Sequence, residues 1–233
     1  MSGKLYLIPN TLGGDDPELV IPGKVLQIMK ELDHFIVENE RNARRFLIKC
    51  GYEKKIDAIR FFILNKHTRN AEKTDFLNPC LKGTNMGIIS EAGVPGVADP
   101  GSDIVSMAHK RKIKTIPLTG PSSVILSLMA SGLNGQQFTF HGYLPVKPHE
   151  RKQKIKFLES EAKKTKSTQI FIETPYRNDA LFNSLKEICN QNTLLCLACD
   201  ISLSTEYIKT MKISEWKKQR VDLKKRPCIF LLA

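Results

Sequence analysis

Strand-like and helix-like segments alternate along nearly all of the 233 residues, and this alternation constrains the fold more than any other feature of the sequence. Short apolar runs such as 5–8, 34–38 and 86–89 have the length and the bounding turns of buried strands. Segments with apolar residues three and four positions apart lie between them, as in amphipathic helices. Such alternation is typical of α/β proteins rather than of sandwiches or helical bundles. We therefore predict an α/β fold.

The predicted elements follow one another in a simple order. Strands are expected at 5–8, 34–38, 60–64, 86–89, 113–118, 138–141, 170–173, 194–200, 205–211 and 228–232. Helices are expected at 22–32, 41–51, 72–82 with a break at Asn78-Pro79, 102–111, 124–131, 150–164, after Arg177 to about Asn190, and 215–219. The chain length favours two domains, which we place at 1–118 and 119–233.

The segment 87–101, GIISEAGVPGVADPG, joins a predicted buried strand to a predicted helix through two glycine- and proline-containing turns. Gly93 and Gly96 can adopt backbone angles that other residues avoid, and a proline stiffens each turn. We expect the turns to leave main-chain N–H groups free to face a ligand, with Glu91 and Asp99 beside them. Ligands of open α/β sheets bind at the carboxyl ends of strands, where this loop would lie. The segment predicts a ligand-binding loop; a turn that only connects strand to helix is the alternative.

The net charge of +12 indicates an anionic partner, because a strongly basic protein attracts polyanions. Eight Lys or Arg against three Glu occupy 147–166, and eight against two acidic residues occupy 209–226. Nucleic acid is the first candidate, and a lysine-rich surface that only improves solubility is the alternative. No apolar run approaches the roughly 20 residues that span a bilayer, and the run 5–8 is too short for a secretory leader. We expect a cytoplasmic protein without a membrane segment.

The six cysteines are expected to be reduced and buried in the core. Cys196 and Cys199 form a C-x-x-C, but they lie in an apolar strand-like run and lack the second pair of a structural zinc site. The five histidines show no metal-ligand spacing. No metal site is predicted.

The chain resembles the tetrapyrrole methylase superfamily, specifically its ribosomal RNA small-subunit methyltransferase I branch, in six segments that run nearly from end to end. They are LYLIPNTLGG (5–14), ENERNARRFL (38–47), ISEAGVPGVADPG (89–101), LTGPSSVILSLMASGL (118–133), FTFHGYLP (138–145) and FIETPYRNDALFNSL (171–185). The resemblance implies a two-domain α/β methyltransferase, usually a homodimer, that holds S-adenosylmethionine in the cleft between its domains. It also implies methylation of a cytidine ribose 2′-hydroxyl in small-subunit ribosomal RNA.

Carried over by position, the resemblance assigns one set of residues to the methyl donor. These are Ser90, Glu91, Ala92, Gly93, Pro95, Val97, Ala98, Asp99, Ser122, Ser123 and Thr174.

A ribose hydroxyl attacks well only if it loses its proton, so a base should lie nearby. Glu38 and Asp99 are the candidate catalytic residues. The residues expected to contact substrate are Arg41 and Arg177 for phosphate or sugar, and Tyr143 and Tyr176 for stacking on an extruded base. Purely structural roles, in ion pairs or in the core, are the alternatives.

The chain departs from the branch at positions that would face the substrate. Asn39-Glu40 stands where an acidic residue and Thr are usual, and Leu203 stands where a lysine is usual. Two further interpretations therefore stay open. One is a methyltransferase for a small planar, tetrapyrrole-like substrate, and the other is a catalytically inactive cofactor-binding RNA module.

Overall fold

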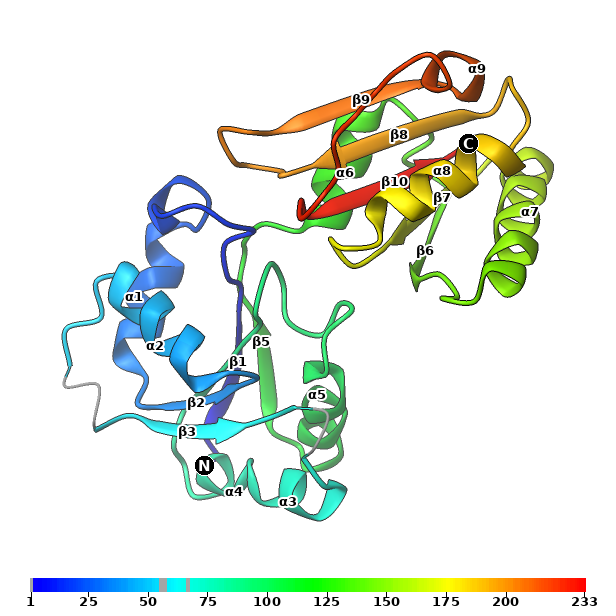
Figure 1. Cartoon of the computed structure of the whole chain (residues 1–233). Helices are drawn as coiled ribbons and strands as arrows, with labels where there is room; N and C mark the ends of the chain where they lie inside the picture. The colour runs from blue at the N-terminus through cyan, green and yellow to red at the C-terminus, as the bar shows by residue number, and fades with distance from the viewer. Residues whose placement is uncertain (1, 55–57, 66–67) are drawn as a thin grey trace. The chain divides into compact units, whose positions relative to one another are not determined.

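The computed structural model describes residues 2–54, 58–65 and 68–233, and its contacts divide the chain into two compact units (Figure 1). The N-terminal unit is Met1–Ser122 and the C-terminal unit is Ser123–Ala233. The sequence placed the boundary at Leu118, whereas the two units divide four residues later, directly before α6 (Ser123–Ser131). Each unit contains a five-stranded sheet covered by helices, so the predicted α/β class is confirmed.

All strands of the N-terminal sheet run parallel, in the order β3-β2-β4-β1-β5. The strands are β1 (Lys4–Ile8), β2 (His34–Val37), β3 (Arg60–Ile63), β4 (Met86–Ile89) and β5 (Lys114–Pro117). The helices are η1 (Pro17–Leu19), α1 (Gly23–Glu31), α2 (Glu40–Lys49), α3 (Asn70–Asp75), α4 (Asn78–Leu81) and α5 (Gly101–Lys110). The expected break at Asn78-Pro79 is confirmed, because α3 ends at Asp75 and α4 begins at Asn78.

The N-terminal sheet buries both of its faces, and alternate residues of β1 serve the two faces. Ile8 packs in a cluster with side chains of α1 and α2, whereas Leu5 packs with side chains of α4 and α5. A parallel sheet with helices on both sides brings the carboxyl ends of its strands to one edge. The loops that follow β1, β2 and β4 therefore lie close together at that edge.

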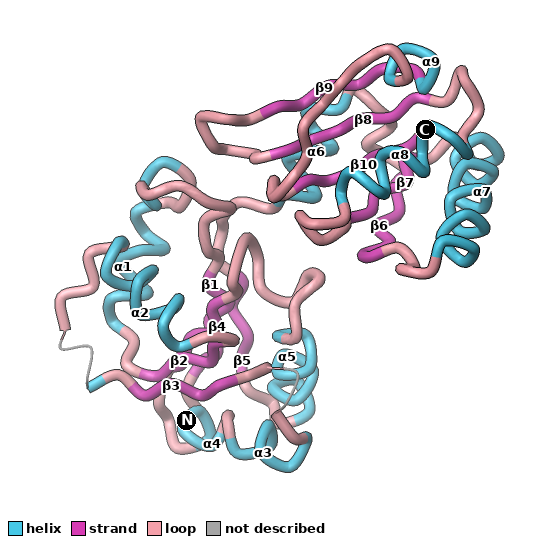
Figure 2. Tube along the Cα trace, viewed as in Figure 1, coloured by secondary structure: helices cyan, strands magenta, loops and turns pink. Residues whose placement is uncertain are grey.

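The sheet of the C-terminal unit is mixed, in the order β6-β7-β10-β8-β9, with only β6 and β7 parallel (Figure 2). Its strands are β6 (Phe138–Tyr143), β7 (Thr168–Ile172), β8 (Leu194–Cys199), β9 (Tyr207–Lys212) and β10 (Cys228–Leu232). Its remaining helices are α7 (Pro148–Thr165), α8 (Asn178–Ile188) and α9 (Ile213–Trp216). Helix α6 packs on β8, β9 and β10, and α7 and α8 pack against each other on the opposite face.

The core of the C-terminal unit is one apolar cluster in which α7, α8 and α9 cover the sheet. The rings of Phe182 and Trp216 meet edge to face, and Phe171 stacks on Phe230 across β7 and β10. Helix α7 has Pro at its first position, where the missing N–H costs no hydrogen bond. The prediction of buried cysteines is confirmed, since all six are buried.

Candidate active site

The segment 90–100, which we call the β4–α5 turn, begins directly after β4 at the carboxyl edge of the N-terminal sheet. Gly93 and Gly96 have φ of +69° and +82°, the left-handed conformation that the sequence predicted for them. Gly93 forms a two-way bridge with Asn10, which follows β1: Asn10 N–H donates to Gly93 O at 2.8 Å, and Gly93 N–H donates to Asn10 O at 3.2 Å. The turn is thereby fixed to the end of the neighbouring strand.

The main-chain N–H groups of the two glycines are not free, so the prediction that N–H groups of the turns face a ligand is wrong at these two positions. Gly93 N–H donates to Asn10, and Gly96 N–H donates to the Asp99 Oδ1 at 3.1 Å. The same carboxylate oxygen accepts the N–H of Gly101 at 2.6 Å. A loop this close to the core must satisfy its own polar groups, and Asp99 does so here. The exposed residues of the turn are Glu91, Ala92, Val97 and Ala98.

The space around Gly93 is tight. A Cβ added there would lie 3.2 Å from Leu12 Cδ2 and 3.4 Å from Pro121 O. The Ser90 hydroxyl is buried beside it and donates to Gly93 O at 2.6 Å. Position 93 therefore requires glycine both for its backbone angle and for its neighbours.

Three carboxylates gather at this edge, from Glu38 after β2 and from Glu91 and Asp99 in the β4–α5 turn. Burial, the charges of Asp99 and Glu91, and a hydrogen bond to Asp99 raise the pKa of Glu38 to about 7. Glu91 Oε2 accepts a hydrogen bond from the Asn42 side chain at 2.6 Å. In the described part of the chain, no Lys or Arg forms an ion pair with any of the three. The site therefore combines excess negative charge with a carboxyl group that exchanges its proton near neutral pH.

Asn39, one of the departures from the branch pattern, has a structural function. Its side chain accepts the N–H of Asn42 at 3.1 Å and so caps the first turn of α2. The cap holds Asn42 where its amide reaches Glu91. Arg41 lies exposed in that same first turn.

In the C-terminal unit, Glu173 occupies the position after β7 that Glu38 occupies after β2. Its side chain is fully buried, and Oε1 accepts Arg177 Nη2 and the N–H of Thr174, both at 2.6 Å. The hydrogen bond from Arg177 to Glu173 raises the pKa of Arg177. Glu173 Oε2 and Arg177 Nε are buried without a hydrogen-bond partner. The guanidinium is thus fixed at the carboxyl end of β7, with 37% of the Arg177 side chain exposed.

Two tyrosines flank this arginine on the surface of the C-terminal unit. Tyr143 ends β6 and is 58% exposed. Tyr176 is 81% exposed in the turn before α8. The alternative of two core tyrosines is therefore wrong. Both rings are available to stack on a planar ligand.

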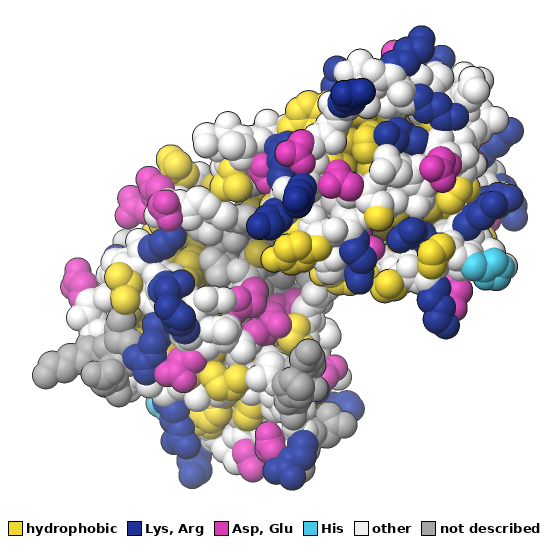
Figure 3. Space-filling view, in the orientation of Figure 1, with side chains coloured by type: hydrophobic (Ala, Val, Ile, Leu, Met, Phe, Trp, Pro, Cys, Tyr) yellow, Lys and Arg dark blue, Asp and Glu magenta, His cyan; other side chains and the backbone are white. Residues whose placement is uncertain are grey.

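The candidate residues thus fall into two groups, one in each unit. The N-terminal group is Glu38, Arg41, Ser90, Glu91, Ala92, Gly93, Pro95, Val97, Ala98, Asp99 and Ser122. The C-terminal group is Ser123, Tyr143, Thr174, Tyr176 and Arg177. Acidic side chains collect on the visible face of the N-terminal unit, whereas Lys and Arg cover much of the C-terminal unit (Figure 3).

Three site residues were not singled out from the sequence. The Asn10 side-chain amide donates to the carbonyls of Ser90 and Glu91, at 2.9 and 3.2 Å. Asn42 holds Glu91, and Glu173 holds Arg177. Glu173 ends a predicted strand and Asn10 lies two residues after another, which is a usable signal; Asn42 lies inside a helix, and nothing in its neighbourhood marks it.

No metal-binding group of three or more His, Cys, Asp or Glu side chains occurs among residues 2–54, 58–65 and 68–233. Within the same ranges, no helix is long and apolar enough to cross a membrane.

Solved structures with the same architecture are methyltransferases of tetrapyrrole chemistry. The methyltransferase CobJ matches with a TM-score of 0.66 at 16% identity, covering 100% of this chain and 94% of its own. Uroporphyrin-III C-methyltransferase from Thermus thermophilus, in complex with S-adenyl homocysteine, matches with a TM-score of 0.58 at 14% identity, covering 99% and 97%. Cobalt precorrin-4 methyltransferase CbiF matches with a TM-score of 0.61 at 13% identity, and the match covers 99% of this chain and 94% of CbiF. The chain has the fold of this class.

Relatives of higher identity define the branch, although no protein-family model matches the chain. Ribosomal RNA small subunit methyltransferase I of Streptococcus pyogenes is 31% identical over 216 residues, which cover 92% of this chain and 70% of the relative. The Vibrio cholerae enzyme of the same name is 28% identical over 233 residues, covering 98% and 76%. The chain belongs to the ribosomal RNA small subunit methyltransferase I family, so the resemblance seen in the six sequence segments is confirmed.

Proposed function

We propose that this methyltransferase transfers a methyl group from S-adenosylmethionine to a ribose 2′-hydroxyl, of a cytidine, in small-subunit ribosomal RNA. The observation that carries the proposal is the carboxylate cluster of Glu38, Glu91 and Asp99, which forms no ion pair with a Lys or Arg among the described residues and contains a group with a pKa of about 7. Membership of a family whose members are named for small-subunit ribosomal RNA supports the substrate class.

The β4–α5 turn fits the methyl donor in charge and in shape. When bound, the donor supplies an electrophilic methyl group on a cationic sulfonium. Three carboxylates without a cation complement that charge. Gly93 and Gly96 allow the positive φ angles of the turn, and the exposed Ala92, Val97 and Ala98 are small or apolar. Ser122, Ser123 and Thr174 are proposed as further contacts.

Glu38 is the proposed general base. In the reaction the ribose oxygen forms a bond to the methyl carbon, the carbon–sulfur bond breaks, and its electron pair stays on sulfur. The hydroxyl proton passes to the Glu38 carboxylate as the bond forms. A base with a pKa of about 7 is half ionised near neutral pH, close to the optimum for proton transfer. Asp99 serves the same step indirectly, since its Oδ1 is occupied by the N–H groups of Gly96 and Gly101.

The C-terminal unit supplies the proposed RNA contacts. Arg177 is fixed by Glu173 and faces phosphate or sugar, and the exposed rings of Tyr143 and Tyr176 stack on the extruded base. Arg41, exposed in the N-terminal unit, is proposed for the same backbone. The basic side chains of α7 attract the RNA over longer distances. We further propose a homodimer that works in the cytoplasm, where small ribosomal subunits are found.

Methyl incorporation tests this function. Small ribosomal subunits from a strain lacking this gene are incubated with the protein and S-adenosylmethionine labelled in its methyl group. A 2′-O-methyl group blocks alkaline cleavage at its own phosphodiester, so the label should appear in one alkali-stable dinucleotide. Absence of label, or label on a base, contradicts the proposal.

A small planar substrate is the weaker candidate. The structures that suggest it share 13–16% identity with this chain and therefore support only the fold. RNA binding that falls steeply with salt separates the two, because neutralised phosphates make affinity depend on ionic strength.

A further inference from the structure

A cavity of about 490 Å³ lies in the C-terminal unit beside the edge strand β6. Gln137 and Thr139 form one wall. The other wall comes from one face of α7 and consists of residues four positions apart: Phe157, Glu161 and Thr165. Cavities of this volume hold small organic ligands in other proteins. None of these five residues belongs to the proposed methyl-transfer site.

The floor of the cavity is a line of hydrogen-bonded polar side chains. Gln169 Nε2 donates to Ser167 Oγ at 2.6 Å, and Ser167 Oγ lies 2.6 Å from Thr165 Oγ1. Gln169 Oε1 is therefore an acceptor, and His141 Nε2 donates to it at 2.7 Å. Burial lowers the pKa of His141, so the ring is neutral at pH 7 and keeps Nδ1 as an acceptor. The floor thus presents polar atoms in fixed directions.

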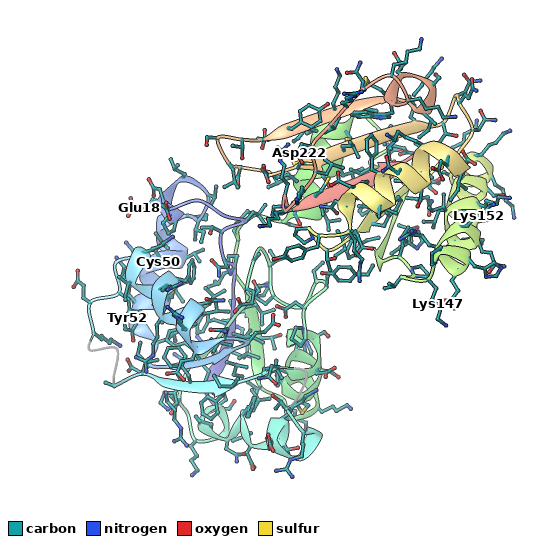
Figure 4. The ribbon with its side chains drawn as sticks, viewed as in Figure 1. Glu18, Cys50, Tyr52, Lys147, Lys152 and Asp222 are labelled. Atoms are coloured by element: carbon teal, nitrogen blue, oxygen red, sulfur yellow. The ribbon has the colours of Figure 1, made fainter. Side chains whose placement is uncertain are left out.

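The mouth of the cavity combines an aromatic ring with a cation. Phe157 is 50% exposed, and Lys154 Nζ lies 4.9 Å from the centre of its ring. The positive charge of Lys154 also acts on His141. Two further lysines extend into solvent near the start of α7: Lys147, which directly precedes the helix and pairs with Glu150, and Lys152 in its first turns (Figure 4). Proteins hold unpaired nucleotides with such groups: a ring for the base, and ammonium groups for the phosphates.

We propose that this cavity binds one unpaired nucleotide of the RNA, at a subsite separate from the methyl-transfer residues. The proposal rests on the proposed RNA substrate and adds a second point of attachment. Among the residues of β6 and β7, those that line the cavity are Phe138, Thr139, His141 and Gln169, whereas Tyr143 and the Arg177 that follows β7 do not line it.

The first test measures binding of a fluorescently labelled single-stranded decauridylate by anisotropy at several salt concentrations. Phe157→Ala should weaken binding at least about fivefold without changing the salt slope, since stacking carries no charge. Lys154→Ala should reduce the slope by about 0.7, the contribution of one phosphate contact to a single strand. Lys163→Ala is the matched control, because it removes the same charge from α7 outside the cavity; it should weaken binding less. Unchanged affinity of a folded Phe157→Ala overturns the proposal.

The second test locates the nucleotide directly in the wild-type protein. A decauridylate carrying one 4-thiouridine is crosslinked by light, and the modified peptides are identified by mass spectrometry. Crosslinks within 137–141 or 154–157 support the subsite, and crosslinks found only elsewhere, or no binding at all, overturn it. Methyl incorporation is measured in parallel. Incorporation without crosslinks at the cavity refutes the subsite alone, whereas crosslinks there without incorporation refute the proposed function.

Discussion

The carboxyl ends of parallel strands differ in charge between the two units: carboxylates gather there in the N-terminal unit, and a glutamate binds an arginine there in the C-terminal unit. In the N-terminal unit, Glu38 follows β2 and lies beside two other carboxylates, which together with burial raise its pKa to about 7. In the C-terminal unit, Glu173 follows β7 and binds Arg177 at 2.6 Å. The same residue type at the same position in a strand–turn–helix connection is thus the proposed proton acceptor in one unit and the ion-pair partner of an arginine in the other. Function at these edges is set by the neighbours of a residue rather than by its place in the fold.

Replacing the proton acceptor gives the largest expected effect. Glu38→Gln preserves shape but cannot accept a proton, so kcat should fall about 100- to 10,000-fold. Affinity for S-adenosylmethionine, measured by calorimetry, should change far less. Glu40→Gln is the matched control, because Glu40 is an exposed carboxylate that pairs with Arg44 on α2. Equal kcat for wild type and Glu38→Gln would remove Glu38 from the mechanism.

The pH dependence of the wild-type enzyme checks the same assignment. The base must be ionised, so kcat/KM should rise about tenfold per pH unit below the Glu38 pKa of about 7 and level off above it. A flat profile from pH 5.5 to 8 would mean that this carboxyl does not take the proton.

The second effect concerns the turn that we propose for the donor. Gly93→Val adds a side chain 3.2 Å from Leu12 at a φ of +69°, so donor affinity should fall about 10- to 100-fold. Gly132→Val is the control, since Gly132 has nearly the same φ, +70°, with nothing within 4 Å of an added Cβ. Both variants should lose stability from backbone strain. Calorimetry should show lost donor binding only for Gly93→Val, and equal losses would place the donor elsewhere.

The third effect concerns the ion pair of Glu173 with Arg177 at the carboxyl end of β7. Glu173→Gln leaves Arg177 without its charged partner in a buried position, and the free energy of unfolding should fall by about 1–3 kcal/mol. Glu150→Gln breaks an exposed pair with Lys147 and should cost less than about 1 kcal/mol. Urea denaturation measures both. If Glu173→Gln lowers the free energy of unfolding no more than Glu150→Gln does, Glu173 does not fix Arg177 in place.

The smallest effect is a change of stability with pH. The folded protein binds the Glu38 proton more tightly than the unfolded chain does, so this group lowers stability as pH rises from about 4.5 to about 7. Glu38→Gln removes this loss of stability with rising pH. At pH 8 the variant should be more stable than wild type by about 1 kcal/mol, after discounting solvent screening of a half-exposed group, and nearly equal at pH 4.5. Thermal unfolding at the two pH values is the measurement; a variant less stable at pH 8 contradicts the raised pKa.

The features that depend on local sequence pattern could be predicted from the sequence. Apolar runs located the strands, Asn78-Pro79 located the break between α3 and α4, and Gly93 and Gly96 have the positive φ expected of them. The sequence did not predict contacts between distant segments. The amide of Gly93 is taken by Asn10, more than 80 positions away, and the pKa of Glu38 depends on Asp99 from another loop. The expectation of free amides failed at Gly93 and Gly96 because only the fold shows which backbone groups already have partners.

A crystal structure with bound S-adenosylhomocysteine tests the central claim most directly, namely that the acid-rich edge of the N-terminal unit holds the methyl donor. The account predicts the ligand against residues 90–99, with its sulfur facing the Glu38 carboxyl group. Ligand bound away from the β4–α5 turn, with that turn unchanged, would contradict it.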